Sequence, residues 1–163
     1  MSKNLHNSKK SSTFAADFAP MSEQNHYIVD LKHLPIGTHL FDLQLDSDFF
    51  SSLEKTEILH GEVVAKAVLN LREEDYQLNI TVRGTVFVVC DRCLDPMPIE
   101  IEANDEIVES EESRDESLDL SWLAYEIVSI NIPIVHSHQA GECNKQMELL
   151  LQDHLCDEPE PEE

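Results

Sequence analysis

Residues 61–90 read GEVVAKAVLNLREEDYQLNITVRGTVFVVC, and this stretch decides the fold. Its first part, Gly61 to Leu71, is rich in Val and Ala, and a second apolar run ends at Cys90. The second run keeps its apolar side chains at alternate positions, the period of a half-buried strand: Leu78, Ile80, Val82, Val86 and Val88. The polar connection Arg72 to Asp75 suits a hairpin. The stretch therefore predicts two paired antiparallel strands.

The segments on either side predict further strands. Downstream, Met97, Ile99, Ile101 and Ala103 alternate with Glu100, Glu102 and Asn104, which predicts a strand with one wet face. Upstream, residues 27–31 and 40–45 also read as short strands. The acidic stretch Asp105 to Ser117 is predicted to be a loop.

Helices are predicted at three places. Asp46 or Ser47 can cap a short helix through the apolar residues Phe49, Phe50 and Leu53. After the strands, apolar residues recur at spacings of three, four and three, which is one face of a helix: Leu120, Leu123, Ile127 and Ile130. Asp119 or Ser117 would cap this helix, and Pro133 would end it. A last helix is expected from Asn144 to about His154, with Met147, Leu150 and Leu151 facing inward. The predicted class is α+β: a mostly antiparallel sheet followed by two C-terminal helices packed on it.

Charge divides the chain unevenly. The 163 residues carry a formal net charge of −22, and residues 91–163, with 21 acidic and three basic side chains, account for −18 of it. We expect a mobile extension over 1–26, a single domain over 27–156 and an acidic tail over 157–163. Such acidity argues against general nucleic-acid binding and against docking on an anionic membrane.

The location and the class of protein follow from what the sequence contains. Nothing in it reads as a signal peptide or as an apolar run long enough to span a bilayer, so a cytoplasmic protein is expected. No Gly-rich phosphate loop and no familiar catalytic motif occurs, and no carboxylate pair stands out. We therefore expect a protein that is not an enzyme.

The chemistry of the sequence lies in Cys90-Asp-Arg-Cys93, for which three interpretations are open. A redox pair would need a helix after the first Cys, and Pro96 and Pro98 make a helix poor there. Half of a zinc site is the second interpretation, in which further ligands would come from His136, His138 and Cys143. In the third, the cysteines are semi-buried thiols with no metal. His154 and Cys156, near the end of the predicted core, are expected to be bystanders.

The run from Val89 to Pro98, VCDRCLDPMP, resembles a motif of the YceD-like family, the large ribosomal RNA subunit accumulation proteins. Residues 27–31, 37–41 and 46–50 fit the layout of that family, as do residues 132–135 with a Cys shortly beyond them. The resemblance covers about 27–156, which would make this one YceD-like domain. The Cys-x-Arg-Cys-Leu segment is its most specific part.

The resemblance implies a non-enzymatic role in ribosome biogenesis, in the synthesis, processing or stability of large-subunit ribosomal RNA. Many relatives carry more cysteines after the proline segment, often a second Cys-x-x-Cys, whereas this chain has Cys143 with His136 and His138 ahead of it. A zinc ion would therefore need mixed ligation by Cys90, Cys93 and Cys143 with one of the two histidines.

The acidity narrows the expected partners. A basic ribosomal protein or a ribosomal precursor fits better than RNA bound by general electrostatics, although a local RNA contact near Arg72, Arg83 and Arg92 stays open. The alternatives are a thiol redox protein that uses Cys90 and Cys93, and an acidic anti-factor or nucleic-acid mimic. The oligomeric state is left open by the sequence.

Overall fold

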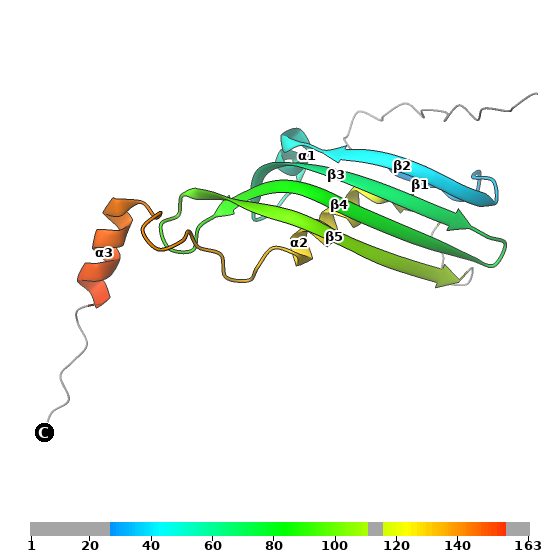
Figure 1. Cartoon of the computed structure of the whole chain (residues 1–163). Coiled ribbons are helices and arrows are strands. Elements are labelled where there is room, and N and C mark those ends of the chain that lie inside the picture. The colour runs from blue at the N-terminus through cyan, green and yellow to red at the C-terminus, as the bar shows by residue number, and fades with distance from the viewer. Residues whose placement is uncertain (1–26, 111–115, 156–163) are drawn as a thin grey trace, which may run out of the picture.

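The computed structural model describes residues 27–110 and 116–155. Its centre is a four-stranded antiparallel sheet in the order β2 (Gly37–Leu45), β3 (Ile58–Leu71), β4 (Asp75–Val89) and β5 (Pro96–Ser110). Each strand pairs with its neighbour in the sequence, so the sheet is a plain meander (Figure 1). The predicted extension 1–26 and tail 157–163 lie outside the described residues.

The predicted hairpin forms the middle of this sheet. Leu71 pairs with Tyr76 and Val63 with Gly84, and the Arg72 N–H closes the turn by donating to the Asp75 carbonyl at 2.9 Å. Along β4, the apolar side chains of the alternating set are all buried, whereas Thr81 and Arg83 are exposed. The period-two pattern therefore identified both the strand and its buried face.

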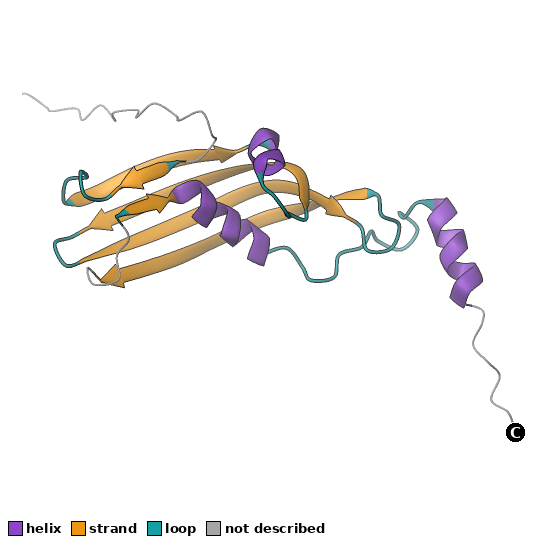
Figure 2. Ribbon diagram, turned by 180° about the vertical axis from the view of Figure 1, so that it is seen from behind, coloured by secondary structure: helices purple, strands orange, loops and turns teal. Residues whose placement is uncertain are grey.

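Within the described residues, helices cover one face of the sheet. The helices α1 (Ser47–Ser52) and α2 (Leu120–Ile130) lie against it, and Figure 2 shows α2 crossing in front of the strands. Both predicted aspartate caps form, because Asp46 accepts a hydrogen bond from the Phe49 N–H and Asp119 accepts one from the Trp122 N–H. Such caps satisfy backbone donors that a helix start leaves free.

A small ribbon secures the beginning of the domain to α2. Strand β1 (Ile28–Asp30) pairs antiparallel with β6 (Ser117–Asp119), which directly precedes the helix. The Tyr27 N–H donates to Ser121 Oγ at 2.8 Å, and the Leu120 N–H donates to the Tyr27 carbonyl at 2.9 Å. No helix among the described residues is long and apolar enough to cross a membrane.

The α+β class and the mostly antiparallel sheet are confirmed, but three details differ. Residues 105–110, predicted as loop, continue β5, because this edge strand keeps pairing with β4 while its acidic side chains are exposed to water or half-buried. In α2, Ile130 is 76% exposed, and the buried face instead includes Ala124 and Val128. The spacing had favoured Ile130 because small residues such as Ala and Ser carry little apolar signal.

The third difference concerns the last helix, α3 (Lys145–Leu155), which forms where it was predicted. It lies beyond the end of the sheet rather than on it (Figures 1 and 2). Leu150 and Leu151, predicted to face inward, are 52% and 41% exposed, and only Met147 packs against buried side chains. The sequence period shows that a helix has an apolar side, but it does not show that the sheet covers that side.

The close approach of β3 and β4 at Gly84 generates a test of this fold. A Cβ atom at Gly84 would lie 2.1 Å from the Glu62 carbonyl oxygen and 2.6 Å from Val63 Cα, both of which are backbone atoms. Gly84→Ala should therefore lower the free energy of unfolding by about 2–3 kcal/mol through overpacking. Urea denaturation followed by circular dichroism measures this loss.

The matched control is Thr81→Ser on the exposed face of the same strand, which should change the free energy of unfolding by about 0.5 kcal/mol or less. Equal stability of the Gly84 variant and the control would contradict the register of β3 against β4.

Candidate metal centre

The turn between β4 and β5 holds the first two cysteines. Cys90 follows the last residue of β4, and its N–H donates to the Asp95 carbonyl at 2.9 Å. The Leu94 N–H donates back to the Cys90 carbonyl at 3.0 Å. Leu94 adopts a left-handed backbone conformation with φ of 62°, which closes the turn tightly. Cys90 and Cys93 are both buried, at 0% and 3% exposure.

The chain that leaves α2 returns to this turn and is fastened to it by a reciprocal pair of hydrogen bonds. The Asp91 N–H donates to the His136 carbonyl at 3.0 Å, and the His136 N–H donates to Asp91 Oδ2 at 2.8 Å. His136 Nδ1 also donates to the Pro133 carbonyl at 2.9 Å. These contacts join segments 45 residues apart, and they place the residues that follow His136 beside the cysteines.

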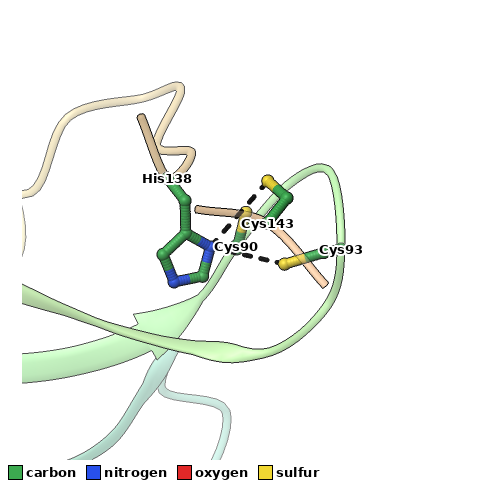
Figure 3. Close-up of side chains that lie close together, drawn as sticks. All are labelled: Cys90, Cys93, His138 and Cys143. Atoms are coloured by element: carbon green, nitrogen blue, oxygen red, sulfur yellow. Dashed lines mark hydrogen bonds between the residues drawn. The ribbon is translucent and has the colours of Figure 1, made fainter. Parts of the chain in front are cut away.

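Four side chains meet at this place: Cys90, Cys93, His138 and Cys143 (Figure 3). Their ligand atoms all lie within 4.8 Å of one another. His138 Nδ1 is 3.3 Å from Cys93 Sγ and 4.0 Å from Cys143 Sγ. Three sulfurs and one imidazole nitrogen that converge in this way could hold a metal ion.

The thiols of this cluster differ in their electrostatics. Burial raises the pKa of Cys90, but hydrogen bonds from the backbone N–H groups of Cys93, His138 and Arg92 outweigh it and lower that pKa to about 6. Burial, together with the neighbouring Cys93 and Cys90, raises the pKa of Cys143 to about 11. The turn thus favours one thiolate, and further thiolates need a positive charge among them, such as a metal ion.

The structure separates the candidates that the sequence offered. It brings Cys90, Cys93, Cys143 and His138 together, whereas His136 is engaged with Pro133 and Asp91 outside the cluster. Cys156 lies outside the described residues. Asp91, which anchors the returning loop, was not predicted from the sequence. The only available signal was its place between the two cysteines, where any polar residue on a turn looks alike.

The turn does not have the geometry of a thioredoxin-type redox pair. Cys90 ends a strand, and the next element is β5, so no helix begins at the first cysteine. A helix N-terminus is the usual means of activating the first thiol of such a pair. Here the thiol is stabilised as thiolate by the N–H groups of the turn and of the His138 loop instead.

The cluster is also the place where α3 is attached. Met147 of α3 and Met97 of β5 pack against the three cysteines. A cavity of about 200 Å³ lies between the turn and the helix, lined by Arg92, Cys93, Cys143, Glu148, Leu151 and Gln152. The described contacts of α3 are therefore made with the cysteine cluster, and the helix does not extend the core of the sheet.

In comparisons with known proteins, the chain matches no protein-family model, no curated protein and no solved structure.

The different placement of the two histidines generates a prediction for metal binding. His138→Gln should weaken Co²⁺ binding more than about 100-fold because a ligand atom is lost, whereas His136→Gln should weaken it about tenfold at most. Titration with Co²⁺, followed through the thiolate charge-transfer and tetrahedral ligand-field bands, measures both affinities.

The second histidine variant serves as the matched control, since both substitutions replace an imidazole in the same loop. A larger loss for His136→Gln than for His138→Gln would show that the wrong histidine has been assigned to the centre.

Proposed function

We propose that this protein is a non-enzymatic ribosome-biogenesis factor that supports the synthesis, processing or stability of large-subunit ribosomal RNA. The proposal rests on the resemblance of residues 89–98 and 132–135 to the YceD-like family. One structural observation supports it: Asp91 in the first segment is hydrogen-bonded to His136, the residue that directly follows the second segment. The two segments, separated in the sequence, are thus held next to each other beside the candidate metal centre.

We further propose that the metal is zinc and that its role is structural. Around a tetrahedral zinc ion, sulfur and nitrogen ligands lie about 3.5–3.8 Å from one another. The separations of 3.3 and 4.0 Å from His138 Nδ1 to two of the sulfurs are close to this spacing. Four protein donors would leave no open position for substrate, which is typical of structural sites.

Zinc would hold together two segments that the hydrophobic core does not reach, the β4–β5 turn and the loop that follows α2. When bound, the ion would supply charge neutralisation for the thiolates of the centre. The chain itself supplies the preformed turn, through Leu94 and Asp95, and the loop anchor, through Asp91 and His136. The free energy of metal binding at such a site contributes to the stability of the folded state.

The expected partner is a basic ribosomal protein or a ribosomal precursor that carries one. Arg72 and Arg83 are already paired with Asp75 and Glu102 at 3.2 and 3.1 Å. Of the three arginines Arg72, Arg83 and Arg92, Arg92 alone has no ion pair among the described residues. A phosphate-binding patch at this place would therefore rest on one arginine. The net negative charge of residues 91–163 would instead steer a basic protein toward this part of the chain. For this role we propose a cytoplasmic location.

The identity of the metal has a direct test. The full chain, purified without chelators, should contain one zinc ion per molecule by elemental analysis, and Cys93→Ser should reduce this to well below half. Cys156→Ser, at a cysteine that is not among the four candidate ligands, should leave the zinc content unchanged. Another metal at full occupancy, or none in freshly purified protein, would rule out zinc.

The cellular role is tested by deleting the gene in its host. Loss of the protein should lower the ratio of large to small ribosomal subunits in sucrose gradients and raise unprocessed large-subunit precursor RNA. Re-expression of the wild-type chain should restore both quantities, and Cys93→Ser should restore them less well because the centre is incomplete. Unchanged subunit ratios and precursor levels in the deletion would refute the proposed role.

A further inference from the structure

Strand β5 lies at the edge of the sheet. It runs over fifteen residues, Pro96–Ser110, and pairs with β4 along its whole length. Within residues 27–110 and 116–155, no strand pairs with its other side, and Figure 1 shows it as the outermost strand. An edge strand presents a row of backbone N–H and C=O groups that can accept a further strand.

The charge of this edge has one sign. The strand carries five acidic side chains, Glu100, Glu102, Asp105, Glu106 and Glu109, and no basic one. Among the described residues, Arg83 is the one cation paired with any of them, through Glu102 at 3.1 Å. A second copy of the same strand would place like charges opposite one another, which is destabilising. The charge therefore favours a basic strand as the occupant.

A groove runs between this edge and α2. It has a volume of about 350 Å³, and its apolar lining includes Ile107, Leu123 and Ile127. Two carboxylates also line it, Asp105 from the strand and Glu126 from the helix. Trp122 Nε1 donates to Glu126 Oε1 at 3.0 Å and so fixes one carboxylate at the rim.

The groove also contains a polar atom that lacks a partner. Ser129 Oγ is buried, and it has no hydrogen-bond partner among the described residues. A buried hydroxyl without a partner costs free energy, which a ligand that bonds to it would recover. Ile130, at the same groove, is 76% exposed. The groove thus combines exposed apolar surface with one unsatisfied hydroxyl group.

We propose that the free edge of β5 and the adjoining groove bind an extended, basic segment of a partner protein by strand addition. Alternate residues of an added strand point to opposite faces. On one face, Lys or Arg side chains would meet Glu100, Glu102 and Glu106, and on the other an apolar side chain would enter the groove between Asp105 and Glu126. Backbone pairing would provide affinity, and the groove would provide specificity.

This inference rests on the proposed function, because it specifies how a basic ribosomal protein would be recognised. RNA is the less suitable occupant, since phosphates would approach five carboxylates and find no cation along the strand. Acidic side chains also protect edge strands from unwanted pairing. Protection alone would not need an apolar groove beside the edge, and that groove favours a specific occupant.

Fluorescence anisotropy with the full chain tests the proposal. The probe is a labelled peptide of alternating lysine and valine, about as long as β5, and it should bind with an affinity that falls as salt is raised. The double variant Asp105→Asn with Glu126→Gln should weaken binding about tenfold, because both rim charges are lost while their shape is kept. Ser129→Val, which fills part of the groove, should also weaken binding.

Two controls separate a specific site from general attraction. Glu73→Gln with Glu74→Gln removes the same charge from the exposed β3–β4 turn and should alter the affinity less than about twofold. A peptide with glutamate in place of lysine should not bind. Equal losses for the two double variants would show that only net charge attracts the peptide and would overturn the proposal. So would the absence of binding, binding of single-stranded RNA to the same edge, or self-association of the chain through it in sedimentation.

The inference and the proposed function can fail separately. Each variant is also expressed in the deletion strain, where the rim variant should restore subunit ratios poorly and the Glu73/Glu74 variant fully. If the deletion disturbs subunit ratios but the rim variant restores them completely, the edge is not the partner surface, although the biogenesis role stands. If the deletion has no effect while the peptide binds at the groove, the biogenesis role fails and the binding site stands.

Discussion

The pairing of β3 with β4 is the interaction on which the rest of the structure depends. These two strands run side by side from Ile58 to Val89, and both remaining strands of the sheet pair directly with them. The helices α1 and α2 pack on the face where the alternating apolar side chains of the hairpin lie. The far end of the hairpin turns into the cysteine loop, so the position of the candidate metal centre is set by the length of these strands.

A metal ion at the candidate centre would compensate for the lack of a hydrophobic core at that end. At the Val89 end of the hairpin, three cysteines with Met97 and Met147 against them form a buried cluster of their own, distinct from the main core. Residues 132–153 include exposed apolar side chains, such as Ile134 and Leu149, and few buried ones. A metal ion with four ligands is a compact way to order such a segment, because one ion would join the turn, the loop and the residues just before α3.

The sequence was sufficient for features that depend on local periodicity. It located the hairpin, the strand β2, the caps at Asp46 and Asp119, and the existence of both C-terminal helices, because each of these follows from spacing within a few residues. It also placed three cysteines and a histidine in one candidate set. It could not choose between His136 and His138, since that depends on a loop whose path is set by hydrogen bonds to Asp91, 45 residues away.

The failures have a common physical cause. Residues 105–110 were predicted to be a loop because their acidic side chains obscure the alternating pattern of a strand. An edge strand nevertheless tolerates charge on the side that water reaches. Leu150 was placed inside because a helical stripe indicates an apolar side, although nothing in the stripe says what covers it. In both cases the sequence pattern does not show which element lies next to the segment in the folded structure.

The same reasoning gives the acidity a structural meaning. Five carboxylates and no basic side chain lie on β5, the strand that forms one edge of the sheet. The candidate metal centre lies at the Pro96 end of that strand, whereas the groove beside α2 lies along its later part, at Asp105 and Ile107. By ordering the turn that precedes β5, the centre would fix where the edge begins, and a strand that adds to this edge would be aligned against a rigid neighbour. Order at the cysteine turn would therefore lower the entropy cost of recognition along the strand, which links the two sites without requiring contact between them.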